Sequence, residues 1–356
     1  MYPALSVLQA IGNRAEKVLW VGGQGGMEAD LLAKYKVPYT SISAAGLHGV
    51  GLKTLPGNLI KLARGTLQSQ KILRKFRPDV LFFTGGYMAV PMAIAGKRFN
   101  SLLYVPDIEP GLALRSLARY SDMIALTAED SRKFFKEGKR MEVTGYPIRA
   151  DLKKWDLETA RNELHLSDDY PVLLIIGGSK GAHLINQAVF VQLPSLLQKA
   201  QVLHLTGQSD WQEAQKVKGL LPASMSQRYH PYPYLYKEIG AAFTCADLAI
   251  SRAGASTLGE FPFFELPAIL VPYPFTWHYQ RVNADYLSSA GAAEVIENNQ
   301  LEEKLIPSVE RLLEDPAALT RMRESMKKIS KPSAAEHIAE LLITLSKNES
   351  GEEKTR

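Results

Sequence analysis

The sequence contains a single cysteine, Cys245, among 356 residues. One thiol cannot form an internal disulfide, and it excludes a metal site built from several cysteines. Because Cys245 lies in an apolar segment, we expect it to be a small core residue. No apolar run approaches the roughly 18 to 20 residues that a membrane-spanning helix needs, and no signal peptide precedes the first predicted helix. We therefore expect an intracellular protein.

Acidic residues are absent from residues 31 to 78, a stretch that carries nine Lys and Arg. The first 150 residues contain 21 Lys and Arg against 11 Asp and Glu, whereas residues 151 to 356 contain 21 against 26. The two halves should therefore meet different partners. A chain of this length can bury two cores. We expect an N-terminal domain at 1–150, a C-terminal domain at 151–346 and a disordered tail at 347–356.

The basic stretch includes a Gly-rich loop that leads into a helix, at residues 46 to 62. Apolar groups beside a cationic rim suit shallow insertion into an anionic leaflet. A solvated helix face with core leucines explains the same pattern, and the sequence does not decide between the two. Nucleic acid is the weaker candidate, since a single aromatic, Phe76, follows Tyr39 and no known binding motif occurs. The expected membrane patch consists of Leu47, Val50, Leu52, Leu55, Leu59, Lys61 and Arg64.

Strand and helix patterns alternate along the chain, which is typical of doubly wound parallel sheets. Short apolar runs predict strands at 18–22, 80–83, 102–105, 123–126, 172–176, 202–206 and 248–251. The first strand of such a sheet usually lies centrally, yet the sequence opens with a helix pattern at 2–11. We expect that a first strand and its Gly-rich loop precede the printed start. Without that strand, two unpaired sheet edges would face each other.

The segment from Leu248 to Glu260 predicts a strand, a tight turn and a helix that opens at Ser256 and Thr257. A helix N-terminus presents unpaired N–H groups and a positive dipole end, which suit phosphate. Glu260, about one turn later, can accept hydrogen bonds from sugar hydroxyls. This pairing indicates a nucleotide sugar, although an ordinary strand-turn-helix with a capping acid is the more frequent explanation of such a segment alone.

Further turns follow other predicted strands. The Gly-rich turn 177–182, with Ser179, is a second candidate for an anion, and its recurrence in the same half strengthens the first. Asp107 and Glu109 follow the strand 102–105 at the rim where ligands bind, as acid/base groups or as caps. Gln280 and Asn283 offer amides to sugar hydroxyls. Residues 229–236 read as an aromatic loop.

The motifs, taken in order from residue 2 to about residue 345, resemble those of the MurG family, glycosyltransferase family 28. The matching segments are Tyr2-Pro-Ala-Leu, Gly85-Gly-Tyr, Gly145-Tyr-Pro-Ile-Arg149, Gly177-Gly-Ser-Lys-Gly-Ala182, Ser251-Arg-Ala-Gly254 with Thr257 and Glu260, Leu266-Pro-Ala-Ile-Leu-Val-Pro272, and Gln280 with Asn283-Ala284. The resemblance implies an α/β protein of the GT-B fold, with two Rossmann-like parallel-sheet domains facing a cleft.

The resemblance also implies an inverting transfer of N-acetylglucosamine from UDP-N-acetylglucosamine to lipid I, the undecaprenyl-linked N-acetylmuramoyl-pentapeptide, in peptidoglycan synthesis. No metal or other cofactor would be obligatory, and the enzyme would be peripheral at the cytoplasmic face of an anionic membrane. The implied donor contacts are Arg149 and Ser179 at the diphosphate, Tyr236 at uracil, Ala255, Ser256 and Thr257 at phosphate, Glu260 at ribose and Gln280 at the sugar. Gly85, Gly86 and Tyr87 would form an acceptor loop.

The chain departs from the family pattern on the acceptor side. The family's Gly-Gly-Thr-Gly-Gly-His loop would lie before Tyr2, its His-Glu-Gln-Asn is Tyr104-Val-Pro-Asp107, and its Gly-Asn-Pro-Val-Arg is Gly145-Tyr-Pro-Ile-Arg149. Asp107 is the only well-placed candidate for the catalytic base that the chain itself retains, and we expect it to take that role. Two alternatives stay open: a transferase for another lipid or small-molecule acceptor, and a donor-binding subunit that works only with a partner or with the missing loop.

Overall fold

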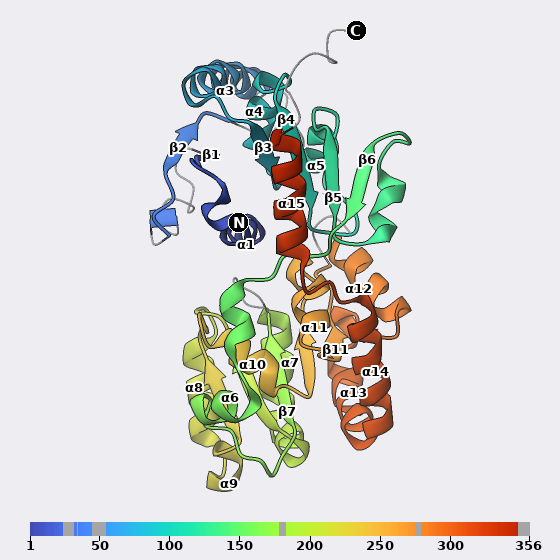
Figure 1. The fold of residues 1–356 in the computed structure, drawn as a ribbon. Helices are drawn as coiled ribbons and strands as arrows, with labels where there is room; N and C mark the ends of the chain where they lie inside the picture. The colour runs from blue at the N-terminus through green and yellow to red at the C-terminus, as the bar shows by residue number, and fades with distance from the viewer. Residues whose placement is uncertain (24–31, 34, 45–54, 178–182, 275–278, 348–356) are drawn as a thin grey trace. The chain divides into compact units, whose positions relative to one another are not determined.

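The computed structural model describes residues 1–23, 32–33, 35–44, 55–177, 183–274 and 279–347. The chain forms two compact units, each built on parallel sheet with helices packed against it (Figure 1). Unit 1 comprises Met1–Pro147 and Ser333–Arg356, and unit 2 comprises Ile148–Pro332. The expected α/β class with parallel sheets in two domains is confirmed.

The unit boundaries correct the predicted domains. The first boundary falls after Pro147, so Arg149 belongs to unit 2. The assignment of residues 333–346 to the second domain is wrong, because helix α15 (Ala334–Lys347) packs against the sheet of unit 1. Its apolar face, which includes Ile338 and Leu342, is buried there, and the side-chain amide of Asn100 donates to the Leu345 carbonyl at 2.9 Å. The predicted tail lies outside the described residues, except for Lys347.

Unit 1 contains two sets of parallel strands. Its elements are α1 (Tyr2–Ile11), η1 (Gly12–Arg14), β1 (Trp20–Gly23), β2 (Tyr39–Ile42), α3 (Leu55–Phe76), β3 (Val80–Phe83), α4 (Ala89–Ala95), β4 (Asn100–Val105), α5 (Leu112–Leu117), β5 (Met123–Leu126), η2 (Glu129–Phe134), β6 (Arg140–Val143) and α15. Strands β3, β4, β5 and β6 form one sheet in that order, and β1 pairs with β2. The central strands β4 and β5 are buried along their whole length, as their apolar runs predict.

Unit 2 has a single six-stranded parallel sheet in the order β12-β11-β10-β7-β8-β9. Its elements are η3 (Ala150–Lys154), α6 (Leu157–Glu163), β7 (Val172–Ile176), α7 (His183–Lys199), β8 (Gln201–Leu205), α8 (Trp211–Leu220), α9 (Ala223–Ser226), β9 (Tyr229–Tyr232), α10 (Ile239–Cys245), β10 (Leu248–Ser251), η4 (Ala255–Leu258), α11 (Glu260–Phe263), β11 (Ala268–Leu270), α12 (Tyr279–Ser289), β12 (Ala293–Val295), η5 (Asn298–Gln300), α13 (Leu301–Glu314) and α14 (Pro316–Ile329). Cys245 is a buried core residue, as expected.

The predicted aromatic loop at 229–236 begins instead with a strand. Residues Tyr229–Tyr232 form β9, and Tyr229 is fully buried. Pro231 has no N–H to donate, a defect that sheets tolerate at an edge. Because β9 is the last strand of the sheet, the proline fits there.

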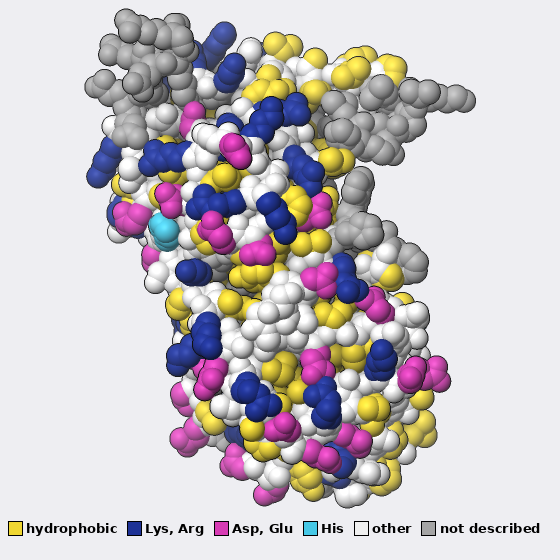
Figure 2. All heavy atoms as spheres, turned by 90° about the vertical axis from the view of Figure 1, so that its right-hand side faces the viewer, with side chains coloured by type: hydrophobic (Ala, Val, Ile, Leu, Met, Phe, Trp, Pro, Cys, Tyr) yellow, Lys and Arg dark blue, Asp and Glu magenta, His cyan; other side chains and the backbone are white. Residues whose placement is uncertain are grey.

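Charge and apolar surface are distributed differently over the two units. In the face that Figure 2 presents, acidic and basic side chains intermingle over unit 2, whereas hydrophobic side chains lie beside Lys and Arg at the upper end of unit 1. Across the described part of the chain, no helix combines the length and the apolar character that crossing a membrane requires.

Candidate functional site

The strand order of unit 2 determines where a ligand can bind. From β7 the chain moves outward to β8 and β9, then returns to the other side of β7 to form β10, β11 and β12. Sheets of this kind bind ligands outside the carboxyl ends of the strands where the order reverses. In unit 2 these strands are β7 and β10, which pair with each other, so a ligand is expected outside their carboxyl ends, at Ile176 and Ser251.

The turn after β10 differs from the helix that the sequence predicts. Residues Ala255–Leu258 form a short 3-10 turn, η4, and Glu260–Phe263 form a single α-helical turn, α11. The Thr257 hydroxyl is not a cap, since it donates to the Gly254 carbonyl at 2.7 Å. Pro262 cannot donate a backbone hydrogen bond, which prevents one continuous helix. The first N–H groups of η4 still have no partner within the turn, so they can face an anion.

Glu260 has the most perturbed carboxyl of this turn. Burial raises its pKa to about 7, although a hydrogen bond with Ser256 and the charge of Arg149 act in the opposite direction. The carboxyl is therefore only partly ionised near neutral pH, and Ser256 and Arg149 both favour its charged form. Perturbed acids in such a crevice are candidates for ligand contact.

Arg149 joins this turn to the loop that follows β9. Its side chain is 17% exposed, and its Nη2 donates to the Tyr236 carbonyl at 3.4 Å. Its Nε lies 3.7 Å from the Asp151 carboxylate. Arg149, Tyr236 and Glu260 are far apart in the sequence, yet the guanidinium contacts the second and acts on the charge of the third. The structure thus gathers three predicted donor residues into one cluster.

Tyr236 offers its ring more openly than its backbone. The residue is 66% exposed, and the ring stacks at a tilt on Tyr234, with 4.5 Å between centroids. The Tyr236 N–H donates to the Glu238 carboxylate at 3.3 Å, and its carbonyl accepts from Arg149. Both bonds are longer than ordinary N–H···O hydrogen bonds. A uracil ring that formed hydrogen bonds with the Tyr236 backbone would therefore displace two weak contacts.

The two amides of α12 have different roles. Gln280 accepts a hydrogen bond from the Tyr273 N–H through its Oε1, at 2.9 Å, which directs its amide group to the end of β11. Asn283 is fully buried and donates to the Ala253 carbonyl at 3.1 Å. The expectation that Asn283 reads sugar hydroxyls is wrong, because its side chain holds α12 against the turn after β10. Gln280 remains a candidate.

Arg252 is a structural residue that sequence reasoning left without a role. It is 8% exposed, and its Nη1 donates to the Val271 carbonyl and to Asn298 Oδ1, at 2.9 and 2.7 Å. Burial lowers the pKa of this guanidinium. The residue ties the end of β10 to the end of β11. The signal in the sequence was an arginine directly after the apolar run 248–251, because a cation at the end of a buried strand needs a partner.

The Gly-rich turn after β7 is described only at its two ends. Ser179 lies outside the described residues, and α7 begins at His183. The His183 ring lies 2.9 Å from the Asp210 carboxylate, which also accepts from Asn186 at 2.7 Å. Asn186 in turn meets His204, whose second ring nitrogen faces the Tyr229 hydroxyl, both at 3.0 Å. Burial lowers the pKa of His204 to about 3, so the network contains a neutral imidazole.

In unit 1, the predicted acceptor residues lie at the carboxyl ends of two adjacent strands. Gly85 and Gly86 follow β3 with φ of 104° and 83°, values that favour glycine. A Cβ on Gly85 would come within 3.1 Å of Leu114, so the turn packs on α5. Asp107 follows β4, half-buried, and its charge contributes to the raised pKa of the buried Tyr104. Adjacent parallel strands bring these turns to one edge of the sheet.

Not every polar group at this edge is a candidate. Glu109 forms an ion pair with Arg115 at 2.8 Å, and the same guanidinium donates to the Pro110 carbonyl. Its role is therefore to hold the start of α5. The Tyr104 hydroxyl is buried and lies 2.8 Å from Thr127. Of the two acids Asp107 and Glu109, Asp107 stays a candidate. Tyr87 follows the Gly turn and is 38% exposed.

The predicted membrane patch is described only in part. Leu47, Val50 and Leu52 lie outside the described residues, and Leu55 is the first residue of α3. Leu59 is 49% exposed and Ile60 is 69% exposed. Lys61 and Arg64 are exposed on the same helix. Core leucines alone therefore do not explain the apolar residues of α3, because Leu59 and Ile60 are exposed.

Known proteins resemble the chain over nearly its whole length. Residues 1–126 match the glycosyltransferase family 28 N-terminal domain and residues 172–338 match the family 28 C-terminal domain. A relative from Roseiflexus sp. (strain RS-1) is 35% identical over 97% of this chain and 92% of its own length. A second, from Halothermothrix orenii, is 35% identical over 96% and 95%. Both are named UDP-N-acetylglucosamine--N-acetylmuramyl-(pentapeptide) pyrophosphoryl-undecaprenol N-acetylglucosamine transferase.

The chain belongs to glycosyltransferase family 28. The resemblance drawn from the motifs is thereby confirmed. Among solved structures, MurG of Acinetobacter baumannii superposes with a TM-score of 0.75 over 96% of this chain and 95% of that one, at 22% identity. A UDP-GlcNAc 2-epimerase from Neisseria meningitidis, solved with UDP-GlcNAc, gives 0.68 over 96% of each chain at 13% identity. These likenesses confirm the expected GT-B fold.

The predicted site residues form two groups, one in each unit. Arg149, Tyr236, Ala255–Thr257, Glu260 and Gln280 all belong to unit 2, around the end of β10. Gly85, Gly86, Tyr87 and Asp107 all belong to unit 1. In unit 2, Arg149 donates to the Tyr236 carbonyl and Glu260 forms a hydrogen bond with Ser256, so these members of the cluster are linked to one another.

Proposed function

We propose that the chain is an inverting glycosyltransferase that moves N-acetylglucosamine from UDP-N-acetylglucosamine to the 4-hydroxyl of N-acetylmuramoyl-pentapeptide on undecaprenyl pyrophosphate. The observation that carries the proposal is the position of the Arg149 guanidinium, between the loop of Tyr236 and the carboxyl of Glu260, beside a strand switch point. The names of the relatives from Roseiflexus and Halothermothrix support the same substrates.

The donor half of the proposal assigns each group one part of the nucleotide sugar. Arg149 carries a permanent positive charge with a forked set of donors, which suits a diphosphate. The first N–H groups of η4, from Ala255 and Ser256, with Thr257 beside them, face phosphate. Glu260 accepts hydrogen bonds from ribose hydroxyls, and Gln280 contacts the sugar. Ser179 contacts the diphosphate region, and Tyr236 borders uracil.

The chemical step is a single displacement at the anomeric carbon. The acceptor 4-oxygen forms a bond to C1 as the bond from C1 to the diphosphate oxygen breaks, and UDP leaves with the electron pair. Attack from the opposite face inverts the configuration. We assign Asp107 as the base that takes the proton of the 4-hydroxyl. Arg149 and the N–H groups stabilise the charge that develops on UDP, so the reaction requires no obligatory metal.

The acceptor half of the proposal concerns a membrane surface. Leu59 and Ile60 are exposed beside Lys61 and Arg64 on α3. Apolar side chains with a cationic rim bind anionic lipid headgroups from the side. The enzyme is therefore peripheral at the cytoplasmic face of the membrane, where it meets its undecaprenyl-linked acceptor.

A second candidate keeps the donor and changes the acceptor. It is favoured by Asp107, which stands where the family pattern has an amide, and by the bulky ring of Tyr146. This enzyme would transfer N-acetylglucosamine to another lipid or a small molecule. A third candidate binds the donor but transfers nothing without a partner.

Calorimetry and a transfer assay test these proposals together. We expect UDP-N-acetylglucosamine to bind, and Arg149→Gln to weaken binding by about 10- to 100-fold, the loss of a charge-assisted hydrogen bond. Arg321→Gln is the matched control, since Arg321 is 68% exposed in the same unit and lies 3.7 Å from Asp315. The absence of UDP binding by folded protein would sink the donor assignment.

Transfer to lipid I, measured beside a diacylglycerol acceptor, separates the candidates. Transfer to lipid I alone supports the first, transfer to diacylglycerol supports the second, and donor binding without transfer supports the third. Asp107→Asn should lower turnover by about 10²- to 10⁴-fold with little change in donor affinity. Full turnover in this variant would refute the role of Asp107.

A further inference from the structure

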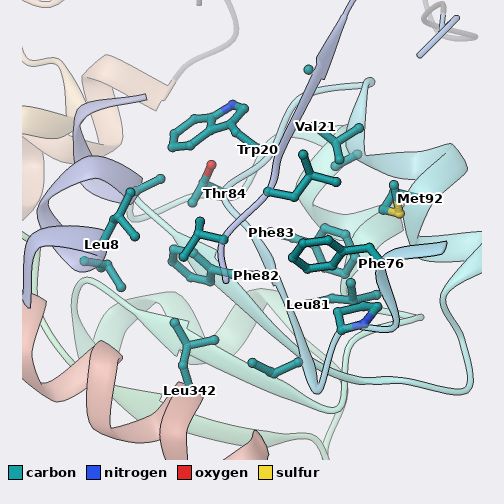
Figure 3. A pocket seen from close by; sticks show the side chains of 18 of the residues that line it. Leu8, Trp20, Val21, Phe76, Leu81, Phe82, Phe83, Thr84, Met92 and Leu342 are labelled. Atoms are coloured by element: carbon teal, nitrogen blue, oxygen red, sulfur yellow. The ribbon is translucent and has the colours of Figure 1, made fainter. Parts of the chain in front are cut away.

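Unit 1 contains a cavity of about 540 Å³ whose lining is mostly aliphatic and aromatic (Figure 3). Trp20 of β1, Phe82 of β3 and Leu342 of α15 are among the side chains that border it. Such a lining suits an apolar group. A hexose has apolar ring faces and a rim of hydroxyls, so it needs an apolar surface with polar groups directly beside it. That combination occurs in unit 2, around Tyr273.

Tyr273 lies just beyond β11, at the edge of the sheet where the segment after β10 also lies. Ser251 of β10 is in register with Leu270 of β11, and the Val271 N–H donates to the Ser251 carbonyl at 2.8 Å. The two strands are parallel, so their carboxyl ends meet at one edge, where ligands bind in such sheets. Tyr273 is therefore one strand away from η4, to which the proposed function assigns the phosphates.

Three side chains hold the backbone around Tyr273. Its N–H donates to Gln280 Oε1 at 2.9 Å. The carbonyl of Pro272 accepts from Asn298 Nδ2 at 2.7 Å and from Arg252 Nη1 at 3.4 Å. Prolines precede and follow Tyr273, and a residue before proline is restricted to extended backbone. The place of this residue is thus determined by α12, by η5 and by its own neighbours.

The Tyr273 ring has one covered face. The Arg252 guanidinium lies over it, with 5.4 Å between Cζ and the ring centroid. Arg252 is 8% exposed, whereas Tyr273 is 42% exposed. The cation attracts the ring face and so restricts the orientation of the ring. Because Arg252 covers one face, the exposed part of the ring is its opposite face and its edge.

The ring and the amide beside it suit the two kinds of surface that a pyranose presents. An aromatic face carries partial negative charge, which attracts the weakly positive C–H groups of a sugar face. The carbonyl end of the Gln280 amide is turned to the Tyr273 N–H, so the amide presents its N–H groups to a sugar oxygen. We propose that the Tyr273 ring packs against the N-acetylglucosamine ring of the donor, while Gln280 contacts its rim. This assignment rests on the proposed function, to which it adds a residue that recognises the sugar rather than the nucleotide.

Calorimetry of the full chain with UDP and with UDP-N-acetylglucosamine tests the proposal. We expect Tyr273→Leu to weaken binding of UDP-N-acetylglucosamine by about tenfold and binding of UDP by less than about twofold. Tyr273→Gln also lacks an aromatic ring and should show the same selective loss. Tyr273→Phe keeps the ring, so its affinity for both ligands should stay within about threefold of the parent.

Tyr170→Leu is the matched control. Tyr170 has a similar stack, with the Arg228 guanidinium 4.4 Å from the ring centroid, but it precedes β7 and so lies at the amino end of the sheet. We expect this variant to bind both ligands as the parent does.

The two ligands distinguish failure of this proposal from failure of the proposed function. An equal loss of UDP and UDP-N-acetylglucosamine affinity in Tyr273→Leu and Tyr273→Gln would place the ring at the nucleotide and overturn the proposal. Unchanged affinity for both ligands in these variants would also overturn it. In either case UDP binding by the parent would still support the donor site. If the folded parent bound neither ligand, the donor site itself would be wrong, and the role of Tyr273 with it.

Discussion

Glu260 combines a shifted pKa with a position that the proposed reaction uses. Burial raises the pKa of its carboxyl to about 7, against an ordinary value of 4.5. Its ionisation therefore changes across the neutral range. A raised carboxyl pKa makes the free energy of unfolding fall as pH rises, because the unfolded chain ionises more readily than the folded one. The contribution of Glu260 to that free energy is complete below pH 4.5 and is lost as pH rises through about 7.

For donor binding the sign is opposite, since ribose hydroxyls need the ionised carboxylate as acceptor. We expect the affinity for UDP-N-acetylglucosamine to rise by about tenfold between pH 6 and pH 8, as the carboxylate fraction increases. In Glu260→Gln the affinity should be weaker and nearly independent of pH over this interval. Calorimetry at several pH values makes the measurement, and an unchanged pH slope in Glu260→Gln would exclude the carboxyl as its source.

Residues with one dominant chemical property were predictable from the sequence, whereas those with two were not. Arg149 and Glu260 were both expected in the donor half, and in the structure the charge of Arg149 acts to lower the pKa of Glu260. Asn283 carries an amide that suits a sugar equally well as a backbone carbonyl, and burial decided for the carbonyl of Ala253. Arg252 acts through the ends of β10 and β11, a pairing that emerges only once the sheet is assembled.

At the scale of elements, a buried polar network connects α7, β8 and α8. Asp210 precedes α8 and accepts from Asn186 and His183 of α7, at 2.7 and 2.9 Å. Asn186 also donates to the Thr206 carbonyl, just after β8. The network holds the start of α7 at His183. We expect Asp210 to act through α7 as a positioning residue for the proposed diphosphate site.

Asp210→Asn should destabilise unit 2 by about 1 to 3 kcal/mol, because one carboxylate oxygen becomes an amide that faces a donor. Urea unfolding measures this loss. Glu213→Gln is the matched control: Glu213 is also on α8 and bonds Gln187 of α7 at 2.7 Å, but this pair is exposed. We expect the control to stay within about 0.5 kcal/mol. Affinity for UDP should fall in Asp210→Asn and not in the control, and equal effects would argue against a positioning role.

Helices and strands could be predicted from the sequence where an apolar run was continuous. The order of the strands in each sheet and the sheet that each helix covers could not be predicted in this way. Strand β3 has the bounds that its apolar run predicts. Strand β9 was missed because Pro231 reads as a strand breaker, and only its position at the sheet edge makes it acceptable. The residues of helix α15 were assigned to the wrong domain. Its apolar stripe indicates that it covers a sheet. The contacts of α15 with α1 and with Asn100, which donates to the Leu345 carbonyl, show that this is the sheet of unit 1.

At the scale of the molecule, charge separates the two halves of the chain. The first 150 residues hold 21 Lys and Arg against 11 Asp and Glu, and the remainder holds 21 against 26. The exposed leucine and isoleucine of α3 are in the basic half, where each nearby cation adds about 1 kcal/mol to attraction by an anionic leaflet. The acidic half contains the proposed donor cluster. The asymmetry supports one membrane-facing unit rather than a uniformly adhesive surface.

Vesicle binding tests this separation directly. The pair Ile60→Ser with Arg64→Gln removes one exposed apolar group and one cation, spaced four residues apart on α3. We expect affinity for vesicles with phosphatidylglycerol to fall by about tenfold or more, and residual binding to weaken further in high salt. Leu220→Ser with Lys216→Gln is the matched control, since Leu220 is 85% exposed and the pair has the same spacing on α8. If both double variants bind as the parent does, or lose affinity equally, α3 is not the membrane contact.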